Sequence, residues 1–561
     1  MQLIECVPNI SEGRDTSIIK QITDVVKTVS GVRLLDVDPG KATNRTVITF
    51  VGEPSSVVEA AFKLIKKASE LIDMSKHSGE HPRMGATDVC PMVPIANITM
   101  EETASYAHQL GERVGNELNI PVYFYENAAK KEERRNLATV RSGEYEGLKK
   151  KLSDPKWKPD FGPDNYEGAQ STGATAISAR DFLIAYNVNL NTTSTRRANA
   201  IAFDVREKGR VAREGGTLSG KIIKDSDGND LWTPGTLKSV KAIGWFIEEY
   251  GVAQISMNLT NISVTSIHKA FDEVASKAQI RGIRVTGSEL VGLVPLNAIL
   301  EAGKYFLEKQ QRSVGVSESE LIKIAVKSLG LDELGPFKPE ERIIEYMLNA
   351  GNEQKLVDLT LTDFANETAS ESPAPGGGSI SAYAGVLGIS LATMVANLSS
   401  HKRGWDDRWK EFSIWAEKGQ RYKNELIRLV DEDTNSFNKI MDAFRLPKGN
   451  ELEIKLRKQE IIKATKYAIA IPLQVMETAY ESMHIIKAMA ETGNPNSVTD
   501  AGVGALCART AVMGAFMNVK INCKDLDDTD YVSDIISRGE KIQEMAQNLE
   551  AEIIKITESK I

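Results

Sequence analysis

The chain has 561 residues, too many for a single hydrophobic core, so about three domains are expected. Its 41% apolar and 26% charged residues are typical of a soluble globular protein, and its net charge of −8 gives no reason to expect a nucleic-acid partner. The four cysteines are scattered without a CxxC pair, which favours a reducing compartment and a cytoplasmic location.

The N-terminal part alternates between short apolar runs and helical periods. No signal peptide is expected, because MQLIECVPNISEGRD has no basic region followed by an apolar core. The predicted elements are strand 2–7, helix 15–29, strand 32–37, a turn at 38–40, strand 46–52, helix 55–73, a strand over 88–95, helix 100–118 and strand 121–126. The order β-α-β-β-α-β is that of a ferredoxin-like, split β-α-β subdomain, extended by the last helix and strand.

The stretch 77–94, HSGEHPRMGATDVCPMVP, is predicted to be a loop. Its glycines and prolines should prevent a helix or a long strand from running through it. It is rich in reactive side chains, namely His77, Glu80, His81, Arg83 and Asp88. A polar loop at the end of an apolar scaffold is where catalytic groups tend to lie. A surface loop whose charges face water is the alternative.

His77 to His81 also match the H-x-x-E-H pattern of zinc proteases. That chemistry requires a helix, because helical spacing brings residues four apart to one face around the metal. Gly79 within the turn costs about 1 kcal/mol relative to alanine, and Pro82 disfavours helical angles at His81. A zinc hydrolase using His77 and His81 stays an alternative, but a histidine general base oriented by nearby acids fits the loop better.

Residues 141–173 are predicted to be irregular, with GPDNYEGAQSTGA at 162–174. Such a segment is either a disordered tether or a binding loop. Trp157, Phe161 and Tyr166 favour a binding loop, because aromatic rings offer a flat ligand a surface for stacking.

A second α/β unit follows with the same order. Its predicted elements are strand 182–190, helix 194–208, strand 238–247, strand 252–261, helix 264–280 and strand 282–287. Two such sheets side by side leave a cleft for a ligand. Between them, residues 221–232 are predicted to form a β-hairpin around Asp227-Gly228, and the spacing of its acids does not fit a calcium loop.

Helical periods replace strand alternation after a linker at 349–355, and residues 356–561 are predicted to form an all-α domain. Helices are also expected at 317–330 and 339–348. The apolar stretch 380–398 approaches transmembrane length, but its Ser, Thr, Tyr and Asn residues favour a buried helix over a membrane span. The glycine-rich turn at 375–379 could bind an anion or serve as a flexible entry into a packed helix. A second helix of small residues begins at Asp500 and is expected to be core.

The helix predicted over 421–444 contains three adjacent acids. Its apolar stripe consists of Leu426, Val430, Phe437, Ile440, Met441 and Phe444. At about 100° per residue, Asp433 projects near the centre of this stripe, whereas Asp431 and Glu432 project toward the flanks and solvent. A buried carboxylate is costly unless it is paired or functional, and its pKa tends to rise. A structural carboxylate that caps another helix is the alternative.

These motifs together resemble the formiminotransferase-cyclodeaminase family over nearly the whole chain. The transferase half of the family is matched by CVPNISEG at 6–13, LLDVDPG at 34–40, TNRTV at 43–47, HSGEHPRMGATDVCP at 77–91 and GSELVGLVPL at 287–296. The cyclodeaminase half is matched by APGGGS at 374–379 and LVDEDTNSF at 429–437.

The resemblance implies a multidomain enzyme of histidine degradation. A formiminotransferase N-terminal subdomain (1–181) and C-terminal subdomain (182–348) would move a formimino group from formiminoglutamate to tetrahydrofolate. The helical domain (356–561) would then close 5-formimino-tetrahydrofolate to 5,10-methenyl-tetrahydrofolate with release of ammonia. The family's catalytic histidine falls on His81 and its catalytic aspartate on Asp433.

The family's folate loop falls on residues 162–173, where this chain has extra residues and matches few side chains. The positions carried over are Gly162, Pro163, Asp164, Tyr166, Thr172 and Gly173. The resemblance also implies polyglutamylated tetrahydrofolate as co-substrate, no metal, and a homo-oligomer with an octamer as the family's assembly. A non-catalytic folate-binding scaffold is the alternative, and the presence of both His81 and Asp433 argues against it.

Overall fold

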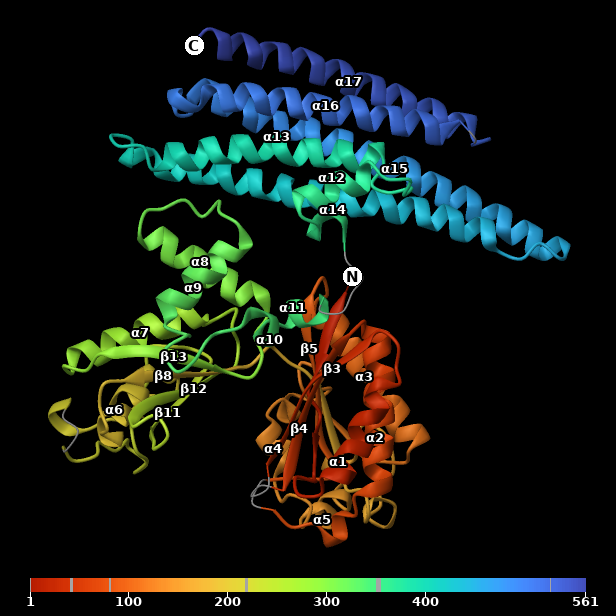
Figure 1. Ribbon diagram of the computed structural model, residues 1–561. Helices are drawn as coiled ribbons and strands as arrows, with labels where there is room; N and C mark the ends of the chain where they lie inside the picture. The colour runs from red at the N-terminus through yellow and green to blue at the C-terminus, as the bar shows by residue number, and fades with distance from the viewer. Residues whose placement is uncertain (1, 41–43, 80–81, 217–219, 350–354, 525) are drawn as a thin grey trace. The chain divides into compact units, whose positions relative to one another are not determined.

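The computed structural model describes residues 2–40, 44–79, 82–216, 220–349, 355–524 and 526–561 (Figure 1). The chain divides into two compact units, one of residues 1–298 with 329–350 and one of residues 299–328 with 351–561. The first unit is α/β and the second is helical. The predicted fold class, α/β subdomains followed by an all-α region, is confirmed.

The first sheet has the order β1-β4-β2-β5-β7-β6, with β3 paired to β4. Its strands are β1 (Leu3–Cys6), β2 (Asn9–Ile10), β3 (Val32–Gly40), β4 (Arg45–Gly52), β5 (Thr87–Ala96), β6 (Val122–Glu126) and β7 (Thr175–Ala179). The helices beside it are α1 (Thr16–Lys27), α2 (Pro54–Leu71) and α3 (Met100–Glu117), followed by short helices α4 (Leu137–Arg141) and α5 (Leu148–Leu152). The strands β3-β4-β1-β5 with α1 and α2 form the predicted split β-α-β order. Strands β7 and β6 extend it by parallel pairing.

Two predictions for this sheet are wrong. The residues Asp38-Pro39-Gly40, expected as a turn, continue β3 and pair with β4. The loop expected over 77–94 reaches only to Ala86, because β5, predicted over 88–95, begins at Thr87 and runs through Pro91 and Pro94. Pro91 is tolerated because it lies opposite the interruption between β1 and β2, where only its carbonyl is used, accepting from the Val7 N–H at 3.1 Å.

The second sheet is antiparallel with the order β11-β12-β8-β13. Its elements are β8 (Ile184–Leu190), α6 (Thr195–Val205), β11 (Val240–Ile247), β12 (Val252–Leu259), α7 (Ile267–Ile280) and β13 (Val285–Val291). Helices α6 and α7 pack on one face of this sheet. The helices that follow are α8 (Leu296–Lys309), α9 (Glu318–Leu329), α10 (Pro339–Arg342) and α11 (Ile344–Asn349).

The predicted hairpin at 221–232 is present. Its turn is closed by Asp225, whose carboxylate accepts the Asp227 and Asn229 N–H groups at 2.9 Å, and Gly228 takes φ +81°. The hairpin lies against a ribbon of β9 (Arg210–Val211) and β10 (Trp232–Thr233). Its apolar residues Ile222, Leu231 and Trp232 are 38–47% exposed.

Replacing residues 221–232 with a short Gly/Ser turn is expected to leave the two activities implied by the resemblance, formimino transfer and cyclodeamination, unchanged. The hairpin is exposed, and shortening a surface insertion changes closure entropy by less than about 1 kcal/mol. Transferase and cyclodeaminase rates of the shortened protein are the measurement. Loss of either activity would mean that the hairpin reaches an active site or a subunit contact.

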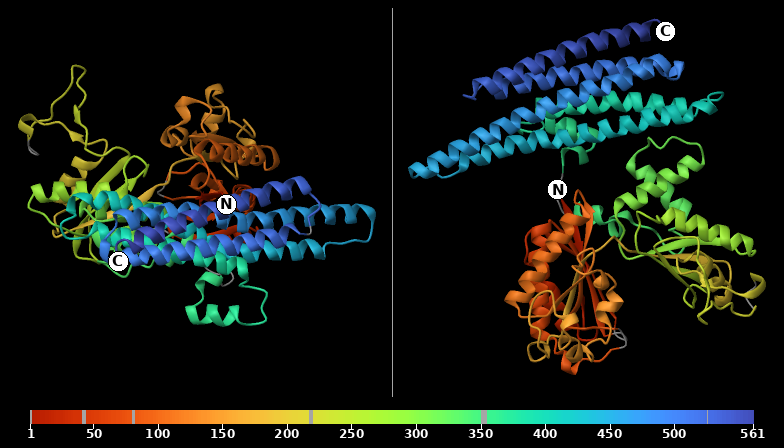
Figure 2. Two further views of the ribbon diagram at one scale, coloured as in Figure 1. Left: turned by 90° about the horizontal axis from the view of Figure 1, so that it is seen from above. Right: turned by 180° about the vertical axis from the view of Figure 1, so that it is seen from behind.

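The helical unit is a bundle of long helices that run side by side in all three views (Figures 1 and 2). They are α13 (Gly377–Ser400), α14 (Trp409–Arg445), α15 (Glu451–Thr492), α16 (Val498–Cys523) and α17 (Thr529–Glu558), preceded by the short α12 (Leu361–Thr368). The small residues of α13 and α16 allow their backbones to meet. A β-carbon on Gly388 would lie 2.8 Å from the Gly504 carbonyl oxygen, too close for any side chain.

Two helical segments, Gly377–Ser400 and Pro495–Cys523, have the length and composition of a membrane span. Core helices of soluble proteins have the same length and composition. In these two segments, 61% and 50% of the most apolar stretch is buried inside the structure. The expectation of a buried helix over 380–398 agrees with the burial of Ala382, Ile389 and Ala392.

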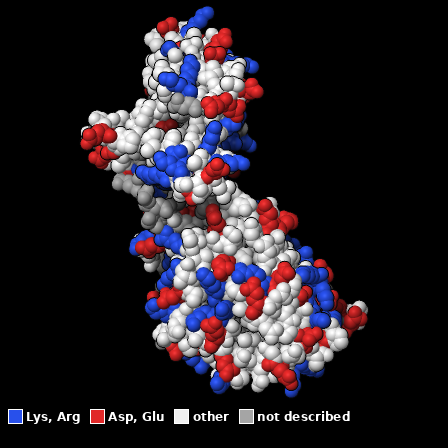
Figure 3. Space-filling view, turned by 90° about the vertical axis from the view of Figure 1, so that its right-hand side faces the viewer, with Lys and Arg blue, Asp and Glu red and all other residues white. Residues whose placement is uncertain are grey.

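The apolar stripe predicted on α14 is only half right. Leu426 and Val430 are fully buried, as expected, but Phe437, Met441 and Phe444 are 38–49% exposed. The C-terminal part of α14 therefore does not bury the predicted face within this chain. Acidic and basic side chains are interspersed on the face of the molecule shown in Figure 3.

Candidate functional site

The loop before β5 is held at both ends by hydrogen bonds. Glu80 and His81 lie outside the described residues, whereas His77, Ser78 and Arg83 on either side are described. Arg83 Nε donates to His77 Nδ1 at 3.2 Å, so the other ring nitrogen, Nε2, carries the proton and donates to the Asn44 carbonyl at 3.1 Å. Asn44 in turn donates its side-chain amide to the Ser78 carbonyl at 2.9 Å.

His77 is therefore a neutral anchor of this loop. Burial, and then the nearby Arg83 charge, lowers the pKa of its imidazole below its ordinary value. Both ring nitrogens are engaged, which leaves no lone pair for a metal. The residues from His77 to Gly79 are also not helical, so the geometry that a zinc site with His77 requires is missing.

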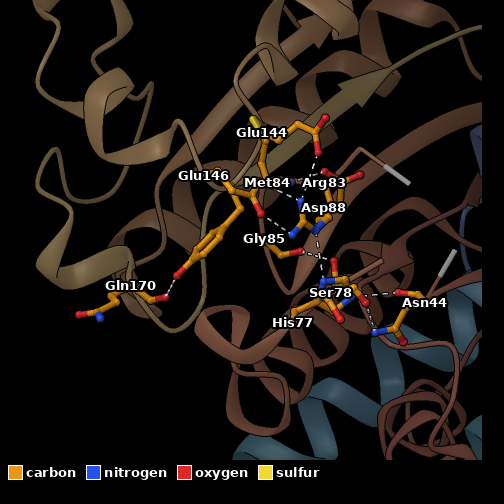
Figure 4. A network of polar contacts seen from close by, with 12 residues as sticks. Asn44, His77, Ser78, Arg83, Met84, Gly85, Asp88, Glu144, Glu146 and Gln170 are labelled. Atoms are coloured by element: carbon orange, nitrogen blue, oxygen red, sulfur yellow. Dashed lines mark hydrogen bonds and ion pairs between the residues drawn. The ribbon is translucent and has the colours of Figure 1, made fainter. Parts of the chain in front are cut away.

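Arg83 is the centre of the network in Figure 4. Its guanidinium donates to both carboxylate oxygens of Glu146 at 2.6 and 3.0 Å and to Glu144 at 3.2 Å, and the residue is only 7% exposed. The Tyr145 N–H donates to the Arg83 carbonyl at 2.9 Å. Two-pronged, charge-assisted hydrogen bonds of this kind stabilise the contact and also fix the orientation of the guanidinium.

The loop is also tied to the start of β5. The buried carboxylate of Asp88 accepts the Met84 N–H at 2.9 Å and Arg141 Nη2 at 2.7 Å. The Ser11 hydroxyl donates to the Gly85 carbonyl at 2.8 Å. The segment 83–88 thus has a single conformation set by Asp88, Ser11 and the Arg83 network.

Replacing Arg83 with lysine is expected to lower kcat/KM of formimino transfer about 10-fold. Lysine cannot form the two-pronged contact with Glu146, and a hydrogen bond between charged groups contributes about 1.5–3 kcal/mol. The rate of cyclodeamination should not change. Arg135, whose pair with Glu132 is exposed, gives the matched Arg135→Lys control. An equal effect in that control would show that the Arg83 network positions nothing.

The C-terminal end of the candidate folate loop lies directly on this segment. The Ala86 N–H donates to the Thr172 carbonyl at 2.8 Å, and the Ala174 N–H donates to the Met84 carbonyl at 3.0 Å. Gly173 has φ +67°, and a β-carbon there would clash with the Met84 carbonyl oxygen. Glycine is required here because the two backbones are in contact. The structure therefore brings Thr172 and Gly173 beside Met84–Ala86.

The other predicted positions of the loop are more spread out. Gly162 has φ +83° and lies against the Ile120 carbonyl, so a residue with a side chain would not fit at this position. Pro163 follows it, and the exposed Asp164 pairs with Lys158 at 3.4 Å. The Tyr166 hydroxyl lies 3.3 Å from that of Tyr145, next in sequence to the Arg83 partners Glu144 and Glu146.

The aromatic residues expected to stack a ligand are largely used in packing. The Trp157 ring lies edge-on to buried Tyr123 at 6.4 Å, and the Phe161 ring lies edge-on to buried Phe124 at 6.1 Å. Both are partly buried and pack against the core of the first sheet. The segment 155–162 folds back onto β6, so part of the ring surface expected to stack a ligand is used in packing.

A polar cavity of about 750 Å³ lies within the α/β unit, between residues of the first sheet and residues of β11 and β12. Four cations line it, Arg45, Arg141, Arg180 and Lys241, together with two acids, Glu126 and Asp181. Burial raises the pKa of both acids and lowers the pKa of Arg45. The excess of positive charge fits an anionic ligand. Apart from Arg45 in TNRTV, no sequence motif pointed to these residues, because they come from segments far apart in the chain.

Asp433 on α14 meets the N-terminus of α13. Its carboxylate accepts the Ser379 N–H, and the Ser379 hydroxyl lies 3.1 Å from it. Gly378 is needed for this approach, because a β-carbon there would clash with the Asp433 carboxylate. Burial raises the pKa of Asp433 above its ordinary value, although the bonds to Ser379 oppose the shift. Asp433 thus accepts hydrogen bonds from the first turn of α13, and its carboxylate is a stronger base than that of an ordinary aspartate.

The neighbouring acids, Asp431 and Glu432, are expected from helix phase to project toward the flanks and solvent. Both are instead half-buried and have hydrogen-bond partners of their own. Asp431 accepts the Leu356 N–H at 2.8 Å, and Glu432 accepts a hydrogen bond from the Tyr467 hydroxyl. The three carboxylates therefore lie in three different environments, and among them only Asp433 lies at the glycine-rich turn 376–378.

Replacing Gly378 with alanine is expected to lower cyclodeamination at least about 10-fold, because the new methyl group displaces the Asp433 carboxylate, and a small misplacement of a catalytic group is costly. Gly376 gives the matched control: a β-carbon there meets only the Pro373 carbonyl oxygen at 3.8 Å. Gly376→Ala should therefore be near wild type. Equal rates for the two variants would show that the contact with Gly378 does not matter.

Comparisons with known proteins cover nearly the whole chain. Residues 3–180 match the formiminotransferase domain, N-terminal subdomain, residues 185–349 match the formiminotransferase domain, and residues 360–541 match formiminotransferase-cyclodeaminase.

Curated relatives agree with these matches. The formimidoyltransferase-cyclodeaminase of Mus musculus is 42% identical over 94% of this chain and 93% of its own length. The glutamate formimidoyltransferase of Thermoplasma acidophilum is 44% identical over 55% of this chain and 93% of its own length. The methenyltetrahydrofolate cyclohydrolase of Methylorubrum extorquens is 31% identical over 38% of this chain and 99% of its own length.

Proposed function

Since the chain belongs to the formiminotransferase-cyclodeaminase family, we propose that its two halves use His81 and Asp433 for successive steps of one folate conversion. The protein is a bifunctional enzyme with glutamate formimidoyltransferase and formimidoyltetrahydrofolate cyclodeaminase activities. It moves the formimino group of N-formimino-L-glutamate to tetrahydrofolate and then closes the product to 5,10-methenyl-tetrahydrofolate, releasing ammonia.

In the transferase step, N-5 of tetrahydrofolate attacks the amidine carbon of formiminoglutamate. His81 removes the proton from N-5, and the glutamate nitrogen leaves from the tetrahedral centre after receiving a proton. The Arg83 network and the bonds to Asn44 hold the residues on both sides of His81. Residues 172–174 contact residues 84–86. This contact supports a folate loop at 162–173, because it brings the C-terminal end of the loop beside the segment that follows His81.

The cationic cavity suits the donor. Formiminoglutamate carries two carboxylates, and Arg45, Arg141, Arg180 and Lys241 supply compensating charge at the cavity wall. Burial raises the pKa of the two acids in the wall, Glu126 and Asp181, above their ordinary values.

In the cyclodeaminase step, N-10 attacks the amidine carbon and the amino group leaves as ammonia. Asp433 takes the proton from N-10 and delivers it to the leaving nitrogen. The raised pKa makes the Asp433 carboxylate a stronger base than that of an ordinary aspartate, which suits removal of the N-10 proton. The contact of Asp433 with Ser379 is the observation that carries this assignment.

The same proposal includes a cytoplasmic location, a polyglutamylated co-substrate, no metal requirement and a homo-oligomer with eight copies as the candidate assembly. The four free cysteines favour the reducing compartment, and the thiols of Cys6 and Cys90 lie 3.5 Å apart without a disulfide. The exposed Phe437, Met441 and Phe444 on α14 are consistent with burial against another copy.

The experiment for the function combines purified protein with formiminoglutamate and tetrahydrofolate. Release of ammonia together with the ultraviolet absorbance of 5,10-methenyl-tetrahydrofolate is expected. A non-catalytic folate-binding scaffold would bind tetrahydrofolate and give neither product. Metal analysis of the active protein tests the absence of a metal separately.

A further inference from the structure

The second sheet has one face away from its helices. Gly244 of β11 contacts α6, since its N–H donates to the Asn199 side chain at 3.0 Å. The residues next to Gly244 in β11, Ile243 and Trp245, therefore lie on the opposite face. Strand pairing arranges this face in three rows: Lys241, Asn258, Ala185 and Val291; then Ile243, Ser256, Asn187 and Glu289; then Trp245, Gln254, Asn189 and Gly287.

A continuous chain of hydrogen bonds runs along the third row. The Trp245 indole N–H donates to Gln254 Oε1 at 3.0 Å, and Gln254 Nε2 donates to Asn189 Oδ1 at 2.8 Å. Asn189 Nδ2 then donates to Glu333 at 2.6 Å. Gln254 and Asn189 are 1% and 0% exposed. The edge of the indole is therefore fixed by buried amides whose own positions are set by a carboxylate.

The Trp245 ring is not buried with its polar partners. Trp245 is 38% exposed and Ile243 beside it is 51% exposed. A large aromatic side chain that is held by its N–H and leaves much of its surface accessible is suited to stacking on a flat ligand. Trp157 and Phe161, by contrast, are partly buried and pack against the core of the first sheet.

The same face leads into the cationic cavity. Lys241 and Asn258 of the first row line that cavity, and Trp245 lies on β11 two residues beyond Ile243 and four beyond Lys241. Alternate residues of a strand are about 6.7 Å apart, so Trp245 lies about 13 Å from Lys241 along the strand. A ligand whose conjugated rings lie over Trp245 can therefore reach an anionic donor molecule that is bound in the cavity.

We infer that Trp245, fixed by Gln254 and Asn189, stacks on the conjugated rings of the tetrahydrofolate co-substrate in the transferase half. The inference rests on the proposed function and adds a specificity residue to it. The face formed by Ile243, Ser256 and Trp245 supplies the surface for the rings, while the cavity holds the negatively charged donor.

The test replaces Trp245 with leucine and measures both substrates of the transferase reaction. We expect KM for tetrahydrofolate to rise about 10-fold or more, in the range expected for loss of one aromatic stacking contact. KM for formiminoglutamate and the rate of cyclodeamination should stay near wild type. Trp245→Phe keeps an aromatic ring and should recover most of the affinity for tetrahydrofolate.

Trp232 gives a matched control, since it is also 38% exposed but lies on the hairpin ribbon. Trp232→Leu should leave KM for tetrahydrofolate unchanged. The inference is overturned if Trp245→Leu leaves this constant unchanged, if Trp232→Leu raises it equally, or if Trp245→Phe is no better than Trp245→Leu. Wild-type protein that transfers no formimino group would overturn the proposed function itself.

Discussion

Replacing His81 with alanine is expected to lower formimino transfer about 10²–10⁴-fold, the usual cost of losing a general base. Cyclodeamination of supplied 5-formimino-tetrahydrofolate should stay near wild type, because His81 belongs to the α/β unit and Asp433 to the helical unit. The two rates are measured separately, the first by loss of formiminoglutamate and the second by release of ammonia.

His108 offers a matched control in the same unit. It is half-buried on α3, and its Nε2 lies 2.8 Å from the Ala128 carbonyl. His108→Gln keeps a polar side chain that can reach this carbonyl, and it should leave transfer near the wild-type rate. If His81→Ala transfers as fast as wild type, or if His108→Gln is equally slow, the assignment of His81 as the base is wrong.

Replacing Asp433 with asparagine is expected to stop cyclodeamination, with a loss of about 10²–10⁴-fold, and to spare the transferase. Asparagine has nearly the same shape and is as good an N-cap as aspartate, so the bond from the Ser379 N–H is kept. The substitution therefore removes proton transfer but not the support of α13. Accumulation of 5-formimino-tetrahydrofolate is the direct readout.

The neighbouring acids provide the controls for Asp433. Asp431→Asn keeps an oxygen for the Leu356 N–H, and Glu432→Gln keeps one for the Tyr467 hydroxyl, so both should retain activity. A purely structural Asp433 would lower the melting temperature without a selective loss of ammonia release. A dead cyclodeaminase with an intact transferase from Glu432→Gln would place the reacting carboxylate on Glu432.

Periodicity and element order predicted most of the fold. The split β-α-β order of both sheets follows from alternation and helical spacing, and the long helices from their apolar periods. The loop predicted over 77–94 extends too far into β5, a strand predicted over 88–95, because Pro91 and Pro94 usually exclude a strand. Only the interruption between β1 and β2 makes Pro91 acceptable, and that depends on pairing partners far away in sequence.

The candidate sites were predictable in part. Helix phase alone predicted that Asp433 differs from its two acidic neighbours, since the angle along α14 depends only on the local sequence. The same phase suggested that Phe437 and Phe444 are buried, yet they are 45% and 49% exposed because the described chain covers them only in part. Local patterns do not show contacts between distant segments. The hydrogen bonds from Arg83 to Glu144 and Glu146 are of this kind, and so are those that link the Trp245 indole to Gln254 and Asn189.

The most direct test of two separate active sites measures methenyl-tetrahydrofolate formed from formiminoglutamate and tetrahydrofolate by His81→Ala and Asp433→Asn protein, each alone and both mixed. Each variant alone should give almost no product. The mixture should restore it, because Asp433→Asn makes 5-formimino-tetrahydrofolate and His81→Ala closes it. Failure of the mixture while supplied 5-formimino-tetrahydrofolate is also not closed by His81→Ala protein would contradict the division of the reaction between His81 and Asp433.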